Sequence, residues 1–322
     1  MTNLGEPITL AAAAPFELRL SLRALAGFRP AAGDAQLGVD RVHQAFSLAD
    51  GHPVVAEVAP AAGGVALRAH GPRGERDRAE LATAVSRWLS LDDDPAPFLA
   101  SARADPAMAP VLAETEGLHQ VRFTGLAEGS CYFVLAQRTS QAVAGSRKRR
   151  LASAFGPPPL EHSGVSHQAF PTLDRLAGCS VGELAPFTAN QRQAEYLAAV
   201  VRRLAEWPPG WGYQVPTEEL LGELRTIRGV GEFTASAIAL RVLGRLDVVP
   251  AMLPTFTRAI DMLYGPGASL AELLAHYGTQ VGLWGYHVRT GLAWLGDAEA
   301  GAVRSARAGS SARTPQLRHR AG

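Results

Sequence analysis

Cysteine is scarce in this sequence, with only Cys131 and Cys179 among 322 residues. Two cysteines supply neither a disulfide framework nor a zinc site, and so few of them suit a reducing cytoplasm. Long apolar runs are missing as well, because no window approaches the length of a membrane span. The apolar residues 10–14 have no basic lead-in and are soon followed by Glu17, which argues against a signal peptide. We therefore expect a cytoplasmic protein with no membrane partner.

A large excess of charge is also absent, since the formal net charge is +1. The basic residues are nevertheless unevenly spread. Residues 147–150 read Arg-Lys-Arg-Arg, and the chain beyond Glu299 carries several arginines and no acidic residue. Whole-chain charge therefore neither supports nor excludes nucleic acid as a partner, and local basic patches become the useful evidence.

The N-terminal part has the patterns of a small antiparallel sheet. Residues 15–25 alternate apolar and polar side chains with period two, which predicts a half-buried strand. Asp50-Gly51 and Gly63-Gly64 each stand between two apolar runs, which predicts two β-hairpins.

Helical spacing replaces this pattern from residue 77 onward, where Leu81, Val85, Trp88 and Leu89 share one face. Up to residue 297 the sequence predicts helices separated by Gly/Pro-rich loops, of which 155–172 and 206–217 are the longest. The segment 298–322 is rich in Ala, Gly, Ser and Arg, which predicts a disordered basic tail. The fold class is therefore α+β, with a β-rich domain over 1–117, a helical body over 118–297 and the tail.

A helical hairpin over 224–242 is the most informative stretch of the helical body. Its sequence "LRTIRGVGEFTASAIALRV" places Gly229 and Gly231 around Val230, and Thr234 opens the second helix. Glycines permit positive φ and close backbone approach, and the following helix N-terminus offers unpaired amides. Such a turn suits a phosphate of a nucleic acid backbone, although a plain helix-helix turn explains the same two glycines.

Several further segments, taken in order, resemble the bacterial 3-methyladenine DNA glycosylase II family, a branch of the helix-hairpin-helix repair glycosylases. The apolar-x-Gly-apolar-Gly pattern followed by Phe-Thr-Ala is one of them. The others are "RWLSLDDDPAPFLASARADPAM", "GLHQVRFTG" with "YFVLAQRTSQAVAG", "AFPTLDRLAGCSVGEL", "GRLDVVPAMLPTFTRAI" and "LWGYHVRTGLAWL". The resemblance covers about residues 87–296. It implies a small sheet domain before two helical domains, and a protein that flips a damaged nucleotide out of double-stranded DNA and hydrolyses its N-glycosidic bond.

The resemblance also implies how DNA is held. The amides around Gly229, Gly231 and Thr234, with Val230 between them, face a phosphate, and the carbonyls of Arg225, Ile227 and Val230 hold a Na⁺ or K⁺ ion. Gln137 falls in the loop that probes the duplex. Arg138 takes the wedge position there, where the alternative is a solvated helix-end arginine. Arg147 and Lys148, just beyond, are expected to contact the DNA backbone.

The base pocket implied by the resemblance contains Phe233, Leu253, Trp284 and Tyr286. An aromatic ring at 233 suits stacking on an electron-poor alkylated base, and a core aromatic is the alternative. The family's catalytic Asp falls on Leu253, which cannot ionise. The three nearest acids, none a convincing substitute, are Asp247, Glu232 and Asp261.

Two functions therefore stay open. The first is a monofunctional glycosylase for alkylated purines, without lyase activity because residue 233 is not lysine. The second is a damaged-DNA-binding protein that does not cut. No organic cofactor motif is present, and we expect a monomer. His162, His167 and His276 are scattered without metal-ligand spacing, so we interpret them as surface or loop histidines.

Overall fold

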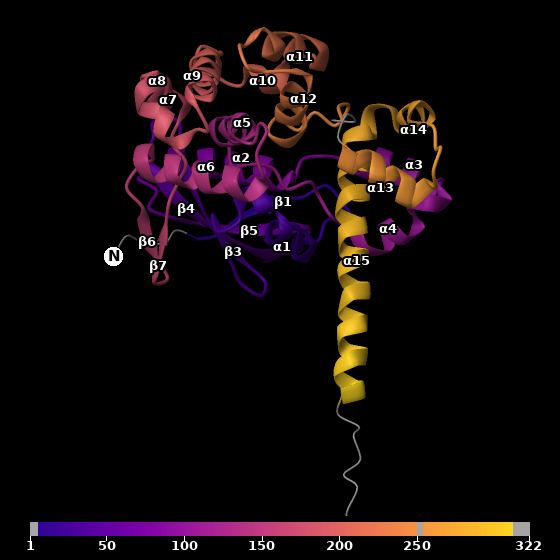
Figure 1. The fold of residues 1–322 in the computed structure, drawn as a ribbon. Coiled ribbons are helices and arrows are strands. Elements are labelled where there is room, and N and C mark those ends of the chain that lie inside the picture. The colour runs from indigo at the N-terminus through magenta and orange to yellow at the C-terminus, as the bar shows by residue number, and fades with distance from the viewer. Residues whose placement is uncertain (1–5, 250–253, 312–322) are drawn as a thin grey trace, which may run out of the picture.

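The protein is described by a computed structural model over residues 6–249 and 254–311. A five-stranded sheet lies at one end, helices cover it, and a second group of helices stands beside a long C-terminal helix (Figure 1). Within the described residues, no helix is long and apolar enough to cross a membrane.

The sheet is antiparallel throughout, with strand order β1-β5-β4-β3-β2. Both predicted hairpins are confirmed. The turn at Asp50-Gly51 joins β3 to β4, and the turn at Gly63 joins β4 to β5, with positive φ at Gly51 and Gly63. The strands are β1 (Ile8–Ala11), β2 (Ala35–Leu37), β3 (Val42–Ser47), β4 (Pro53–Ala61) and β5 (Gly64–His70).

The strand predicted over residues 15–25 is wrong, because α1 (Leu18–Gly27) forms there. The leucines of this segment fit both the period of two of a strand and the 3.6-residue period of a helix. Leu18, Leu22 and Leu25 recur at helical spacing and pack in the sheet core, whereas Leu20 packs elsewhere, with Leu118 and others. Burial on two sides of a helix reproduces the alternation expected of a strand, and tertiary packing decided between them.

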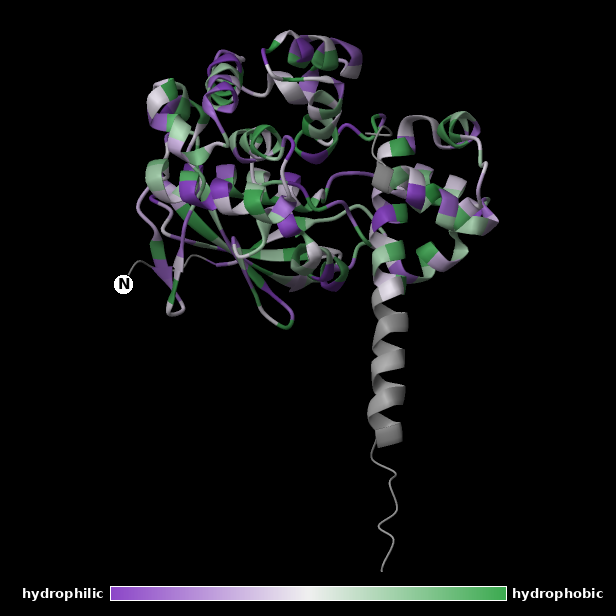
Figure 2. Cartoon of the chain, in the orientation of Figure 1, coloured by the Kyte–Doolittle hydropathy of each residue, from purple (hydrophilic) through white to green (hydrophobic). Residues whose placement is uncertain are grey.

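One face of the sheet packs on α1 and on α2 (Glu75–Leu89). The sequence predicts the helix α2 correctly. The core there joins Val42, Phe46 and Val54 of the strands to Leu81 and Trp88 of α2. The hydrophobic colouring of the central strands in Figure 2 marks this layer.

The rest of the chain is mainly helical. The helices up to the candidate hairpin are α3 (Ala96–Arg103), α4 (Ala109–Thr115), α5 (Leu126–Leu135), α6 (Gln141–Phe155), α7 (Leu173–Ala177), α8 (Val181–Leu184), α9 (Gln191–Ala205) and α10 (Trp211–Gln214). The hairpin itself and the later helices are α11 (Thr217–Thr226), α12 (Glu232–Arg241), α13 (Pro254–Tyr264), α14 (Leu270–Tyr277) and α15 (Val281–Ser311).

Helices distant in sequence share a second core beside α15. Phe98 of α3 and Val111 of α4 pack with Ile260, Trp284 and Val288 from α13 and α15. Residues that precede the predicted boundary at 117 therefore belong, by packing, with the C-terminal helices, and the chain crosses between the two groups more than once (Figure 1).

Two of the predicted loops contain structure. The 155–172 segment forms a small hairpin of β6 (Leu160–His162) and β7 (Val165–His167), and 206–217 contains α10. The interpretation of His162 and His167 as isolated surface or loop histidines is wrong: both end strands, and His167 is buried. His276 is exposed on α14 as expected. Past residue 298, where composition predicts disorder, α15 continues as helix to Ser311, in keeping with the helix propensity of its Ala and Arg residues.

Candidate nucleic-acid interface and cleft

The α11–α12 hairpin has a tight turn that requires glycine at one position only. Gly229 has φ +93°, and a Cβ there would lie 2.6 Å from Cβ of Tyr196. Gly231 has φ −89°, and a Cβ there would meet nothing within 4 Å. Gly231 is the N-cap of α12 and makes no side-chain capping bond. The first turn of α12 thus presents backbone amides at an open surface, the arrangement that binds anions.

The turn is fixed from below by apolar anchors and by one polar side chain. Ile227 and Val230 are buried in the main helical core. Gln137, at the end of α5, donates a hydrogen bond from Nε2 to the carbonyl of Gly229 at 2.8 Å, and its Nε2 lies 3.4 Å from Oγ1 of buried Thr234. The structure therefore brings Gln137 together with the hairpin, where it braces the turn.

Arg138 is exposed in the loop between α5 and α6 and has φ +54°. A non-glycine residue in the left-handed region costs about 1–2 kcal/mol and persists only where the surroundings impose it. An exposed, strained arginine one residue from the side chain that braces the hairpin is placed to reach a ligand held there.

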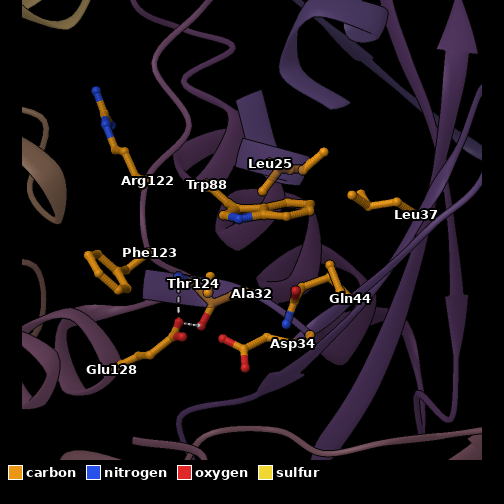
Figure 3. Close-up of a pocket in the computed structure, with 14 residues that line it drawn as sticks. Leu25, Ala32, Asp34, Leu37, Gln44, Trp88, Arg122, Phe123, Thr124 and Glu128 are labelled. Atoms are coloured by element: carbon orange, nitrogen blue, oxygen red, sulfur yellow. Dashed lines mark hydrogen bonds between the residues drawn. The ribbon is translucent and has the colours of Figure 1, made fainter. Parts of the chain in front are cut away.

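Lys148 does not lie on this surface, so its predicted backbone contact with DNA is wrong. Its side chain is buried and its Nζ pairs with both Asp34 and Glu128. Burial raises the pKa of the Asp34 carboxyl to about 6 against the opposing charge of Lys148. Figure 3 shows Asp34 and Glu128 side by side in a pocket, with Glu128 also accepting from Thr124. Lys148 therefore neutralises two buried acids.

Arg147 is half-buried on α6, and its Nη1 is buried with no hydrogen-bond partner among the described residues. Two members of the 147–150 run are exposed, Arg149 and Arg150, and they donate to the carbonyls of Ala32 and Pro186 at 2.8 and 3.1 Å. The contact of Arg147 with DNA stays a prediction.

A cleft of about 660 Å³, open solvent included, lies beside the hairpin. It is formed where α12 faces α13 and α15, with α5 contributing one side chain. The lining residues are Phe133, Phe233, Ala237, Leu240, Arg241, Val249, Phe256, Ala259, Gly285, Tyr286 and Arg289. An apolar cleft with aromatic walls suits a planar ring.

Two of the predicted pocket aromatics line this cleft, and one does not. Phe233 is 38% exposed at its edge, and Tyr286 forms part of its wall. Trp284 is wholly buried: it stacks on Tyr277 at 5.0 Å and donates to the hydroxyl of Tyr264 at 2.9 Å. Trp284 is thus a core residue that supports α15.

The charges lining the cleft come from two arginines that the sequence did not single out. Arg241 donates to the carbonyl of Val121 at 2.9 Å and lies over the rings of Phe28 and Tyr286. Burial lowers the pKa of Arg241 to about 10, so it stays protonated at neutral pH. Arg289 is exposed on α15 at the same cleft. Among the described lining residues there is no carboxylate.

None of the three candidate acids reaches this lining. Asp247 is exposed and accepts a hydrogen bond from Thr217 at 3.0 Å. Glu232 is exposed in the first turn of α12, and Asp261 is exposed on α13. Leu253 lies outside the described residues. The predicted cation ligands remain a prediction: the carbonyl of Ile227 accepts from the amide of Val230 at 3.0 Å, which leaves a lone pair free.

Sequence reasoning missed Arg241, Phe256 and Arg289. Arg241 ends α12 on the same face as Phe233, and the helical spacing of 233, 237, 240 and 241 is the signal that could have found it. Phe256 and Arg289 come from separate helices, and no local pattern assigns them to one cleft.

Known proteins are similar to this chain in sequence, and solved structures are similar to it in fold. The DNA-3-methyladenine glycosylase of Bacillus subtilis is 29% identical over 174 residues, 52% of this chain and 55% of that protein. A Mycobacterium tuberculosis protein named probable bifunctional transcriptional activator/DNA repair enzyme AlkA is 33% identical over 178 residues, 54% of this chain and 35% of that protein. The chain thus matches only about half, or less, of the length of these relatives. No family model matches it.

Among solved structures, a 3-methyladenine DNA-glycosylase from Archaeoglobus fulgidus has TM-score 0.71 at 20% identity, over 88% of this chain and 97% of that one. A Clostridium acetobutylicum 8-oxoguanine glycosylase/lyase, in complex with double-stranded DNA, has TM-score 0.60 at 19% identity, over 82% of this chain and 98% of that one. Identities this low establish the fold alone. The chain therefore has the fold of these glycosylase structures, and about half of its sequence is similar to the DNA-3-methyladenine glycosylase and the probable AlkA protein named above.

Proposed function

We propose that this protein binds double-stranded DNA through the α11–α12 hairpin, flips an alkylated base into the cleft and hydrolyses its N-glycosidic bond. One observation carries the proposal: α12 serves both sites. Its uncapped N-terminus forms the anion-binding turn, and Phe233, Ala237, Leu240 and Arg241 on the same helix line the cleft. A phosphate held at one end of α12 fixes a nucleotide beside the other.

The hairpin binds the DNA backbone without reading sequence. Its amides contact a phosphate, and a Na⁺ or K⁺ ion at the carbonyls of Arg225, Ile227 and Val230 adds positive charge there. Arg138, beside the hairpin, enters the space that the flipped base leaves, because a planar guanidinium stacks between bases. We expect the protein to act as a monomer, because one hairpin and one cleft form a complete unit.

Charge in the cleft decides which alkylated bases fit best. Arg241 and Arg289 bring positive charge to the lining, and no described lining residue offsets it. A base that already carries a positive charge, such as 7-methylguanine, is repelled there. A neutral alkylated base with acceptor nitrogens, such as 1,N6-ethenoadenine, accepts hydrogen bonds from the same guanidinium groups. Phe233 stacks on either ring.

The composition of the cleft lining favours a second function, a protein that recognises damaged DNA without cutting it. A positioned carboxylate normally stabilises the oxocarbenium-like transition state, and loss of one such electrostatic group costs about 10²–10³-fold in rate. The cleft lining has no carboxylate among its described residues. Catalysis without one relies on flipping, desolvation and the leaving-group quality of the alkylated base.

The test is incubation of the full chain with duplexes containing 1,N6-ethenoadenine or 7-methylguanine, followed by alkaline cleavage at abasic sites. Excision above that of an undamaged duplex supports the glycosylase. Tight, lesion-selective binding with no excision supports the second function instead, and absence of both refutes the site. Phe233→Ala separates the two parts, since it should reduce lesion selectivity while leaving affinity for undamaged duplex unchanged.

Leu253→Asp is the complementary variant. It restores an acid at the position where the resemblance expects one, so gain of excision identifies Leu253 as a cleft residue. Leu253→Asn, which has the same shape but no charge, is its matched control.

A further inference from the structure

Four histidines from separate strands converge on the face of the sheet that is turned away from α1 and α2. They end or occupy β3, β5, β6 and β7, and they are His43, His70, His162 and His167. Glu57 of β4 pairs directly with His43 across the β3–β4 ladder. Their neighbours along each strand, such as Val42 and Val58, point to the opposite side, into the core with α1 and α2.

The β6–β7 hairpin covers this face of the sheet. Leu160 of β6 packs against Ala45 and Val55, which lie on the same side as His43 and Glu57. The histidines of the hairpin are thereby brought over those of the sheet. The His70 and His162 rings stack at 3.7 Å between centroids, and the His43 and His162 rings lie 5.1 Å apart.

The donor atoms converge on a space of ionic size. Ligand atoms of His43, Glu57 and His162 all lie within 4.8 Å of one another. Oε2 of Glu57 is 3.7 Å from Nε2 of His43 and 3.2 Å from Nε2 of His70. His167 lies beside them, with ring centroids 6.1 Å from His43 and 6.2 Å from His162. Its Nε2 is buried with no hydrogen-bond partner in the described part of the chain.

The protonation states suit metal binding. Burial lowers the pKa of His43, His70 and His167, which keeps the imidazoles neutral with a free nitrogen lone pair. Burial on its own would raise the pKa of Glu57, but the hydrogen bond from His70 lowers it overall. Neutral imidazole and ionised carboxylate are the forms that bind a metal ion.

The spacing fits a tetrahedral site. With Zn–N bonds of about 2.0–2.1 Å, two imidazoles on one tetrahedral Zn²⁺ have centroids about 5 Å apart, as the His43 and His162 rings do. Two ligand atoms of one ion lie at most about 4 Å apart, whereas the ligand atoms of His43, Glu57 and His162 lie within 4.8 Å of one another. Side-chain shifts of about 1 Å therefore bring them to bonding positions. Imidazole with one carboxylate favours Zn²⁺ and its transition-metal neighbours over Mg²⁺ or Ca²⁺.

We propose that His43, Glu57 and His162 bind one divalent transition-metal ion of the zinc class, with His167 as the fourth ligand. His70 acts as a positioning residue, because it holds the Glu57 carboxylate and stacks on His162. This site needs no cysteine, and its ligands come from four strands, so neither cysteine counting nor local histidine spacing reveals it.

The ion ties the β6–β7 hairpin to the N-terminal sheet. The hairpin and the strands β3 and β4 lie at the left of Figure 1, whereas α13 and α15 of the cleft lie at the right. The metal is therefore structural, and its loss should destabilise the fold without touching the cleft. The proposal does not depend on glycosylase activity.

The test uses the full chain, stripped with EDTA and then titrated with Zn²⁺ by calorimetry and with Co²⁺ by visible absorption. We expect one saturable site, d–d bands typical of tetrahedral Co²⁺, and a Tm that rises by about 5 °C at 100-fold excess over Kd and falls again on chelation. His162→Asn and Glu57→Gln should each weaken binding by at least about 10-fold.

His276→Asn is the matched control, because this histidine is exposed on α14, where it hydrogen-bonds the carbonyl of Ser101 far from the four clustered histidines. It should bind metal as the unaltered chain does. Circular dichroism of the stripped proteins establishes that each variant folds, and Glu57→Gln, which keeps the side-chain shape, serves if His162→Asn does not. The proposal is overturned if Zn²⁺ and Co²⁺ do not bind saturably, or if they bind a folded Glu57→Gln or His162→Asn protein as tightly as the control.

Discussion

Two glycines of the hairpin should respond to the same substitution in opposite ways. Gly229→Ala places a methyl group against Tyr196 at a residue with φ +93°. The left-handed conformation costs an alanine about 1–2 kcal/mol, and displacing a packed ring costs about 1–3 kcal/mol more. We therefore expect the free energy of unfolding to fall by about 2–4 kcal/mol. Gly231→Ala meets open space at φ −89° and should change it by no more than about 0.5 kcal/mol.

Gly231→Ala should weaken DNA binding even though it costs little stability. The methyl group of Gly231→Ala would stand where a phosphate approaches the first amides of α12, and it should remove about one charge-assisted hydrogen bond. Such a bond contributes about 1.5–3 kcal/mol, which corresponds to a Kd about 10–100-fold higher for any duplex sequence. A stable protein with weakened, sequence-independent binding is the expected phenotype.

Urea unfolding followed by circular dichroism measures the first effect, and fluorescence anisotropy with a labelled duplex at fixed salt measures the second. Tyr196→Ala in the Gly229→Ala background should recover the steric part of the loss and leave the φ strain. A phosphate-binding turn is refuted if Gly231→Ala binds DNA as tightly as the unaltered chain. The steric difference between the two glycines is refuted if Gly231→Ala unfolds as readily as Gly229→Ala.

Three further outcomes are expected from the cleft and the core. The acids outside the cleft should not be catalytic, so excision, measured by alkaline cleavage, should stay within about twofold in the variants Asp247→Asn, Glu232→Gln and Asp261→Asn. A 100-fold loss of excision in one variant would identify that acid as catalytic. Arg289→Gln should raise excision or binding of 7-methylguanine relative to 1,N6-ethenoadenine, and an unchanged ratio would show that cleft charge does not select the lesion. Burial lowers the pKa of His287 to about 3, so below pH 6.5 the unfolded chain takes up a proton that the folded chain does not. Stability should fall as pH drops from about 6.5 toward 3, by up to about 1.4 kcal/mol per pH unit from this residue. His287→Gln should flatten that slope in urea titrations, and an unchanged slope would contradict the role of this residue.

Local chemistry made part of the fold predictable. Asp50-Gly51 and Gly63 mark turns because few other residues accept their backbone angles, and the strands are delimited by the turns. The segment of α1 was mispredicted because Leu20 is buried against a different element from Leu18 and Leu22, so the pattern has no single face. A sequence window cannot reveal that a short helix is buried on two sides.

The candidate site divides along the same line. The sequence marks the turn by Gly229 and Gly231 alike and places Phe233 at a fixed spacing from it, but only the structure shows that Gly229 alone requires glycine. Lys148 was misplaced because a run of four basic residues does not show which one faces inward. Its partners Asp34 and Glu128 lie 114 and 20 residues away. Long-range pairing of buried charges is set by the fold, and so is the meeting of Arg241 and Arg289 at one cleft.

The position of α12 connects the two parts of the proposed function, the phosphate-binding turn and the cleft. From Gly231 to Arg241 the helix advances about 15 Å, at 1.5 Å per residue, and Ala235 and Ile238 bury its inner face. In the proposed function, a phosphate at the N-terminal turn and a base in the cleft would therefore be held at a fixed separation by a rigid element. Turns that bind phosphate are common, but here the helix behind the turn also walls an aromatic cleft. In the proposed function, that linkage would let a contact with the DNA backbone position one nucleotide.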